Sequence, residues 1–136
     1  MNFSSIARFF DLAIEQPGTA IYTKFIALCL LYGATVHLGN ILGFTGTPWL
    51  VTPLLWRSLD ILLLIFNLVT AIALWRGFGW SILLLYGGII LFQIVPYTVW
   101  RSHFILKPED GEILNGLLGT EILLLSILSL LLWLKK

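Results

Sequence analysis

The fold is decided by residues 54–100, which read LLWRSLDILLLIFNLVTAIALWRGFGWSILLLYGGIILFQIVPYTVW. Two apolar runs, 54–75 and 80–100, lie on either side of the short segment RGFG at residues 76–79. Each run has about 20 residues, enough for an α-helix to cross a hydrocarbon layer of about 30 Å. The two glycines permit the backbone angles of a tight turn, so we expect an antiparallel pair of membrane-spanning helices.

Two further apolar runs flank this hairpin, at roughly residues 22–44 and 113–134. The chain has 136 residues, of which 59% are hydrophobic and 11% charged, whereas a soluble domain carries about 25% charged residues. Four spans use most of a single membrane domain over residues 1–136, which leaves no room for a soluble catalytic domain. We therefore expect an all-α integral membrane protein, folded as an up-and-down four-helix bundle.

The segment before the first span is amphipathic. At about 100° per residue, Phe3, Ile6 and Phe10 share one face, and Arg8 and Asp11 share another. The sequence QPG at residues 16–18 should end this helix. We expect an interfacial helix over about residues 3–15, lying along the membrane surface ahead of the bundle.

The tryptophans and the basic residues predict how the bundle lies in the membrane. All six tryptophans fall at the predicted ends of the spans, as amphipathic rings prefer: Trp49, Trp56 and Trp100 at one interface, and Trp75, Trp80 and Trp133 at the other. More basic residues flank the spans on the side of the termini (Arg8, Lys24, Arg76, Lys135, Lys136) than on the opposite side (Arg57, Arg101, Lys107). Both termini should therefore be cytoplasmic, in a bacterial inner membrane or a thylakoid membrane. We call the side opposite the termini the outer side.

Polar residues of the spans gather toward the outer side. His37 and Asn40 lie in the outer half of the first span, Asp60 near the outer end of the second, and Gln93 and Tyr97 in the outer half of the third. Polar groups are costly in hydrocarbon, so these side chains should face the bundle interior or a hydrated cavity. We predict a ligand pocket that is open to the outer side and lined by His37, Asn40, Gln93 and Tyr97.

Four charged residues, Arg57, Asp60, Arg101 and Glu121, are candidates for a charge pair or a partner contact. Arg57 and Asp60 are three residues apart on one helix, so we expect an internal ion pair. Arg101 lies just beyond the third span and can reach lipid headgroups. Glu121 lies about eight residues into the fourth span and has no basic residue within one turn. It needs a partner from another helix, a partner from another chain, or a proton.

The choice for Glu121 depends on the face of its helix. Asn115, Gly119 and Ser126 share one stripe of the fourth span, and Glu121 projects about 120° away from Asn115. If the Asn115 stripe faces the bundle centre, Glu121 cannot face it too. We therefore favour a contact between Glu121 and another chain.

Two backbone features should shape the helices near the pocket. Gly39 and Gly43 form a GxxxG pattern, which permits close approach of a neighbouring helix. Pro96 cannot donate an amide hydrogen bond to the carbonyl of Phe92, so the third span should bend near Gln93.

His37 is the one candidate for a cofactor ligand. Its ring nitrogen suits proton transfer, or axial ligation of the metal of a haem or a chlorophyll, although a packed structural histidine gives the same pattern. His103, the other histidine, lies in the loop after the third span, so no set of metal ligands is predicted. Walker, HExxH and GxSxG motifs are absent, which speaks against an enzyme. A net charge of +1 speaks against nucleic-acid binding.

The chain resembles the DoxX-like small membrane proteins in size, in four-span topology, in an N-terminal amphipathic segment carrying Arg8, and in a glycine followed by a histidine in the first span, Gly33 and His37. That group includes members linked to quinone-coupled oxidation of sulfur compounds or thiols, so the resemblance implies a lipophilic redox partner such as a quinone. The chain has a single cysteine, Cys29, so such an activity would need another subunit.

Two functions remain as expectations. The first is an accessory subunit of a larger energy-converting or redox membrane complex, which holds a quinone, pigment or lipid in the outer pocket. Its partners would be membrane lipids together with other membrane subunits or further copies of the chain. The alternative is a stand-alone carrier of protons, ions or small solutes that uses His37, Asp60 and Glu121. Few polar residues lie below Asn67, which should mark the inner limit of the pocket.

Overall fold

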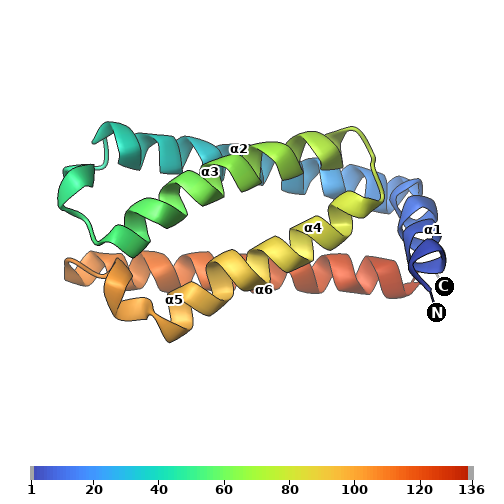
Figure 1. Cartoon of the computed structure of the whole chain (residues 1–136). Coiled ribbons are helices and arrows are strands. Elements are labelled where there is room, and N and C mark those ends of the chain that lie inside the picture. The colour runs from blue at the N-terminus through green and yellow to red at the C-terminus, as the bar shows by residue number, and fades with distance from the viewer. Residues whose placement is uncertain (1, 135–136) are drawn as a thin grey trace.

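The computed structural model describes residues 2–134, and every regular element in that range is a helix (Figure 1). Four spans are long and apolar enough to cross a membrane. In order after α1 (Phe3–Ile14), they are α2 (Pro17–Leu42), α3 (Leu54–Trp75), the composite span α4 (Trp80–Ile89), η2 (Ile90–Ile94) and α5 (Val95–Val99), and α6 (Pro108–Leu134). Short helices η1 (Trp49–Val51) and η3 (Arg101–Phe104) lie in two of the connections. The predicted all-α class with four long apolar helices is confirmed.

Helices α2 and α6 begin earlier than the apolar pattern predicts. Their first residues are Pro17 and Pro108, each five positions before the expected start. Proline has no amide hydrogen, which the first turn of a helix does not need, and its fixed φ suits that position. Asp110 then accepts hydrogen bonds from the amides of Leu106 and Lys107, at 2.8 and 3.1 Å, and so fastens the preceding turn to the start of α6.

Helix α1 crosses the end of the bundle at which the termini lie (Figure 1). The side chain of Asn2 caps it by accepting a hydrogen bond from the amide of Ser5 at 2.9 Å. Its last residues, Ala13 and Ile14, are buried, whereas Phe3 at its start is exposed. The helix therefore packs on the bundle at its C-terminal end and presents apolar surface elsewhere, as predicted for an amphipathic segment.

The hairpin between α3 and α4 sets the antiparallel geometry of the central pair. Gly77 has φ +78°, a conformation that favours glycine, and the amide of Phe78 bonds to the carbonyl of Ala73 at 3.1 Å. About two turns into α4, the ring of Phe66 from α3 occupies the space that a Cβ at Gly88 would take. Glycine thus permits both the turn and the close packing that follows it.

The close approach between α2 and α3 uses a glycine other than the predicted pair. A Cβ at Gly33 would lie 2.8 Å from the side-chain nitrogen of Asn67. The expectation for Gly39 and Gly43 is wrong, since a Cβ at Gly39 would meet only a Thr45 methyl group at 3.9 Å and one at Gly43 would meet nothing within 4 Å. Gly43, with φ +80°, instead ends α2 in a left-handed cap.

The third span contains a π-helical turn at η2, where the sequence predicted a bend. The amide of Val95 bonds to the carbonyl of Ile90, five residues back, just before Pro96. In an α-helix, residues spaced by four drift about 40° around the axis at each step. The wider turn takes up part of this drift, so Leu85, Ile89, Gln93 and Tyr97 all border one cavity.

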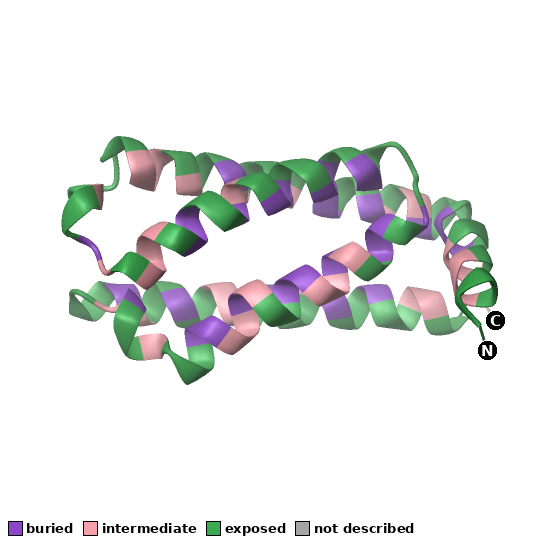
Figure 2. Cartoon of the chain, viewed as in Figure 1, coloured by how far each residue is buried: buried purple, intermediate pink, exposed green. Residues whose placement is uncertain are grey.

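The buried residues lie between the spans, and the outward faces are apolar and exposed (Figure 2). Leu63, Leu74, Ile82, Leu85 and Leu128 are fully buried in the core. Exposed Leu, Ile and Val side chains on all four spans suit a lipid environment. The two ends of the described chain lie at the same end of the bundle (Figure 1). Lys135 and Lys136, used in the orientation prediction, lie outside the described residues, and the cytoplasmic location of the termini stays a prediction.

Candidate functional site

A cavity of about 850 Å³ lies between the helices, and its lining extends into both outer connections at Thr45, Trp49 and Lys107. It is bordered by residues of α2, α3, the composite third span and α6. The sequence-predicted pocket residues His37, Asn40, Gln93 and Tyr97 all line this cavity, as do Asp60, Asn67 and Glu121. We call it the outer pocket.

The outer pocket opens sideways between α2 and α6. Exposed lining residues form one stripe on α2, at Leu28, Tyr32 and Val36, and another on α6, at Ile113, Gly116 and Thr120. Deeper in the bundle the two helices are joined, because the hydroxyl of Tyr22 donates to the carbonyl of Leu124 at 2.8 Å. If the spans cross a membrane, this opening faces the lipid.

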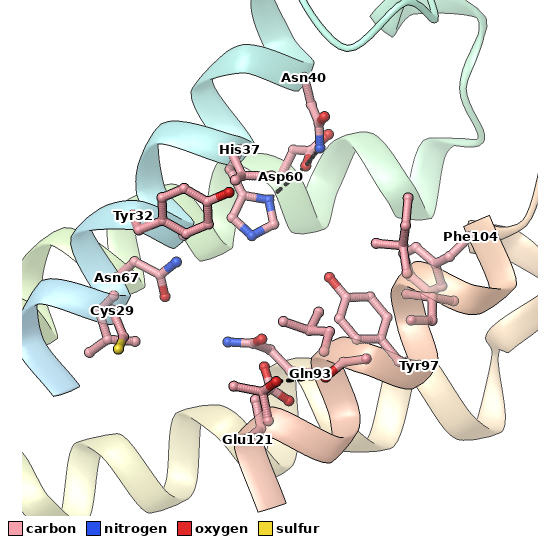
Figure 3. Close-up of a pocket in the computed structure, with 18 of the residues that line it drawn as sticks. Cys29, Tyr32, His37, Asn40, Asp60, Asn67, Gln93, Tyr97, Phe104 and Glu121 are labelled. Atoms are coloured by element: carbon pink, nitrogen blue, oxygen red, sulfur yellow. Dashed lines mark hydrogen bonds and ion pairs between the residues drawn. The ribbon is translucent and has the colours of Figure 1, made fainter. Parts of the chain in front are cut away.

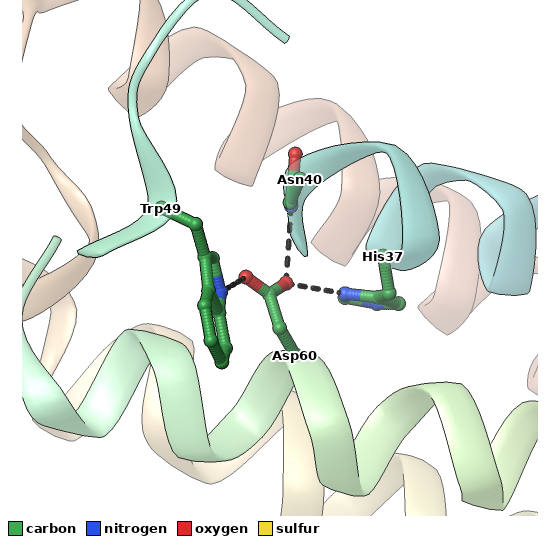
Figure 4. A network of polar contacts seen from close by, with 4 residues as sticks. All are labelled: His37, Asn40, Trp49 and Asp60. Carbon is green, nitrogen blue, oxygen red and sulfur yellow. Dashed lines mark hydrogen bonds and ion pairs between the residues drawn. The ribbon is translucent and has the colours of Figure 1, made fainter. Parts of the chain in front are cut away.

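One wall of the outer pocket is a closed network around Asp60 (Figure 4). Oxygen Oδ1 of Asp60 bonds to Nδ1 of His37 at 2.8 Å and accepts from the amide of Asn40 at 3.0 Å. Oxygen Oδ2 accepts from Nε1 of Trp49 at 3.0 Å. Asp60 is 2% exposed, so these donors replace the water that a buried carboxylate would otherwise need.

The network fixes the chemistry of His37. An ionised carboxylate only accepts hydrogen bonds, so Nδ1 of His37 carries the hydrogen that points to Asp60. In the neutral ring, Nε2 is then an acceptor, and Figure 3 shows the ring turned toward the opposite wall of the pocket. Asp60 therefore holds His37 in the orientation of a base, or of a ligand to a metal-centred ring.

The predicted ion pair between Arg57 and Asp60 is wrong. Within residues 2–134, Asp60 is hydrogen-bonded to His37, and Nε of Arg57 is buried with no hydrogen-bond partner. Donors from α2 and η1 occupy both carboxylate oxygens, and Arg57 does not line the pocket. Competition from more distant segments of the chain outweighs the i, i+3 spacing on which the prediction rested.

The opposite wall has polar groups without partners. Glu121 is 5% exposed, and its Oε2 atom is buried with no hydrogen-bond partner in the described part of the chain. Neither the amide of Gln93 nor the hydroxyl of Tyr97 makes a hydrogen bond to a described residue. Figure 3 shows these three side chains across the pocket from the Asp60 network.

The expectation that Glu121 faces another chain is wrong, because Glu121 lines the outer pocket of its own chain. The stripe expected to face inward, Asn115, Gly119 and Ser126, is exposed. Asn115 accepts a hydrogen bond from Nη2 of Arg101 at 2.7 Å, and the same nitrogen donates to the carbonyl of Gly111 at 2.8 Å. Arg101 therefore braces the start of α6 on the outside of the pocket.

Asn67 lies on the pocket wall next to Gly33, and its Oδ1 atom is buried without a partner. Its residue exposure is 3%. The lining continues past it to Cys29 and Ile26, one and two turns further along α2, so Asn67 does not close the cavity. It is the last amide group in the lining, and the deeper walls are mainly aliphatic.

The sequence did not single out Trp49, which it assigned to the membrane interface. No spacing rule links a loop residue to an aspartate 11 positions later. Within residues 2–134 no group of three His, Cys, Asp or Glu side chains could hold a metal ion.

Comparison of the chain with protein-family models, with curated proteins and with solved structures gives no match. The site is therefore interpreted from its own geometry, and the DoxX-like resemblance stays an expectation.

Proposed function

We propose that the chain binds a lipophilic small molecule with a polar head in the outer pocket. The observation that carries the proposal is a cavity of about 850 Å³ whose buried walls hold polar groups without partners, Glu121 and Asn67. Such groups are costly to leave unpaired, and a ligand head that bonds to them removes that cost. Small-molecule sites commonly have volumes of about 300–1,000 Å³.

The position of the opening supports a ligand taken from the lipid phase. Leu28 and Val36 on α2 and Ile113 on α6 give the opening apolar sides. A lipophilic tail can lie along these side chains while the head reaches the polar walls. Quinones, pigments and membrane lipids are all molecules of this build, and a pigment would bind axially to Nε2 of His37.

We place this binding role in an accessory subunit of a larger energy-converting or redox membrane complex. The support is that the described connections between spans are short and the polar groups of the spans are used in a pocket. A stand-alone carrier has less support, because the core beyond Cys29 is formed by fully buried side chains such as Leu74, Ile82 and Leu128. The buried polar side chains there include the hydroxyls of Thr23, Thr70 and Ser81, and the described part of that core has no buried carboxylate or histidine to carry a proton.

Two glycines on α6 provide a matched test. Gly116 lines the pocket and Gly119 does not, and a Cβ at either position would meet nothing within 4 Å. Gly116→Phe should fill the opening, whereas Gly119→Phe should add the same ring outside the pocket. Each protein would be purified in mild detergent. Its absorption spectrum would be recorded, and co-purifying small molecules and subunits would be identified by mass spectrometry.

We expect one lipophilic compound to be retained by the wild type and by Gly119→Phe and to be lost from Gly116→Phe. Identical sets of small molecules in all three preparations would overturn the binding proposal. A co-purifying subunit in the wild type would support the accessory role, whereas isolation of the chain alone under all mild conditions would contradict it.

A further inference from the structure

The outer pocket is lined by more acidic than basic side chains. Four carboxylates line it, those of Asp60, Glu109, Asp110 and Glu121, against a single ammonium group, that of Lys107. Lys107 is exposed in the connection before α6, whereas Glu121 is buried. Two carboxylates are already satisfied: Asp60 by three donors and Asp110 by two backbone amides. Of these four carboxylates, Glu121 is the one that is buried and accepts no hydrogen bond from a described residue.

No described residue donates a hydrogen bond to Glu121, although the amide of Gln93 and the hydroxyl of Tyr97 on the same wall are donors that also lack partners. Buried acceptors also remain open at Oδ1 of Asn67, and Nε2 of His37 accepts in the neutral ring that Asp60 orients. A ligand head that only accepts hydrogen bonds, such as a carboxylate, a phosphate or an oxidised quinone, could accept from Gln93 or Tyr97 but would leave Glu121 and Asn67 Oδ1 without a donor. A head that donates hydrogen bonds would supply that donor.

Aromatic rings favour a positive charge in the same space. Tyr32, Trp49, Trp56, Tyr97 and Phe104 all line the pocket. The rings of Tyr97 and Phe104 are packed edge to face with centroids 5.0 Å apart, and that of Trp56 lies 6.2 Å from Phe104. The faces of aromatic rings attract cations, more strongly where water is excluded.

Building on the proposed function, we propose that the ligand of the outer pocket is a lipophilic amine, bound as its ammonium ion with Glu121 as counter-ion. The ammonium hydrogens donate to the Glu121 carboxylate, and the tail lies along the apolar opening between α2 and α6. The bound ammonium ion forms an ion pair with Glu121, which has no partner among the described residues. The amine should therefore bind more tightly than an alcohol of the same shape, which carries no charge.

Three probes with one phenylbutyl tail and different heads test this inference: 4-phenylbutylamine, 4-phenylbutanol and 5-phenylpentanoate. Their binding would be measured near pH 7 by equilibrium dialysis against the full chain in lipid nanodiscs, with the uptake of empty nanodiscs subtracted. The variants are Glu121→Gln, which keeps the shape of the side chain, and Glu112→Gln, which removes the same charge from an exposed position of α6 outside the pocket.

We expect the wild type to bind the amine about tenfold more tightly than the alcohol, and the carboxylate most weakly. Glu121→Gln should lose this preference while still binding the alcohol, which also shows that the variant is folded. Glu112→Gln should keep the preference. Equal binding of all three probes to the wild type, or an unchanged preference in Glu121→Gln, would overturn the amine assignment and leave the proposed function standing. Absence of binding by every probe would overturn both.

Discussion

Asp60 is the residue on which the polar side of the pocket depends. It joins α2, α3 and η1 through His37, Asn40 and Trp49. A buried carboxylate of this kind is stabilised only while its donors remain in place, and each donor in turn loses its acceptor if Asp60 is replaced. The network therefore orders the outer connection that carries Trp49 as well as the ring of His37.

A double-mutant cycle tests this assignment. Asp60→Asn puts an amide nitrogen in place of an oxygen that accepts hydrogen bonds, so it should lower the free energy of unfolding by about 1–3 kcal/mol. Trp49→Phe removes one of these hydrogen bonds and should lower the free energy of unfolding by about 1 kcal/mol. The combined variant should lose less than the sum, because the two changes remove one shared bond. Unfolding by titration with sodium dodecyl sulfate would supply the energies.

A second double-mutant cycle, which combines Asp60→Asn with Arg57→Gln, serves as the control. Since Arg57 forms no ion pair with Asp60 in the described chain, these two changes should be additive within about 0.5 kcal/mol. Coupling between Arg57 and Asp60, with none between Trp49 and Asp60, would restore the i, i+3 pair and refute the network.

At the residue scale, the sequence predicts how deep a polar residue lies in the bundle better than it predicts the hydrogen-bond partner of that residue. The polar character and position of His37, Asn40 and Gln93 in their spans were sufficient to predict one pocket-lining group. The partner of Asp60 was not predictable, since Trp49 approaches it through the fold of a connection and not through a helical repeat. Trp49 also has the position expected of a tryptophan at the membrane interface. A tryptophan at that depth can lie at the interface or donate a hydrogen bond inside the bundle, and the sequence does not distinguish the two roles.

At the scale of elements, the contact between α3 and α4 depends on a glycine that cannot be enlarged. The ring of Phe66 lies in the space of a Cβ at Gly88, and it also packs edge to face on Phe92 with ring centroids 5.8 Å apart. The ring therefore cannot move without disturbing Phe92 in the η2 turn. The adjacent Gly87 has nothing within 4 Å of its Cβ position.

These neighbouring glycines make a matched pair of substitutions. Gly88→Ala should lower the free energy of unfolding by about 1–3 kcal/mol through overpacking. Gly87→Ala should be neutral or raise it by up to about 1 kcal/mol, because alanine favours the helix. The thermal midpoint of each variant in detergent would rank them, and a Gly88→Ala variant as stable as Gly87→Ala would show that α3 and α4 do not pack this closely.

The boundaries of the elements were predictable where the backbone chemistry is local. The RGFG turn, the end of α1 before Pro17 and the irregular turn before Pro96 follow from glycine and proline alone. The early starts of α2 and α6 did not follow from hydropathy, since their first turns are more polar than the spans they open. Which glycines permit close packing also depends on the neighbouring helix, and the GxxxG pattern alone does not predict it.

At the scale of the whole molecule, hydropathy predicts the four spans but not how each is rotated. Helix α6 is apolar on nearly every face, so it has no periodic signal that distinguishes its inward side. The sequence therefore assigned the Asn115 stripe to the centre, whereas the structure places Glu121 there. The same rotation leaves Gly116 beside the outer pocket and Gly119 outside it.

The central claim is that the outer pocket holds a lipophilic ligand between the Asp60 network and Glu121. The most direct test is to map photolabelling with a phenylbutylamine that carries a diazirine on its ring, using the chain in nanodiscs. The account predicts cross-links to lining residues such as Cys29, Leu117 and Thr120, competed by excess unlabelled amine and lost in Gly116→Phe. Cross-links confined to exposed residues away from the pocket, such as Ile72 and Ile122, and insensitive to competitor would contradict it.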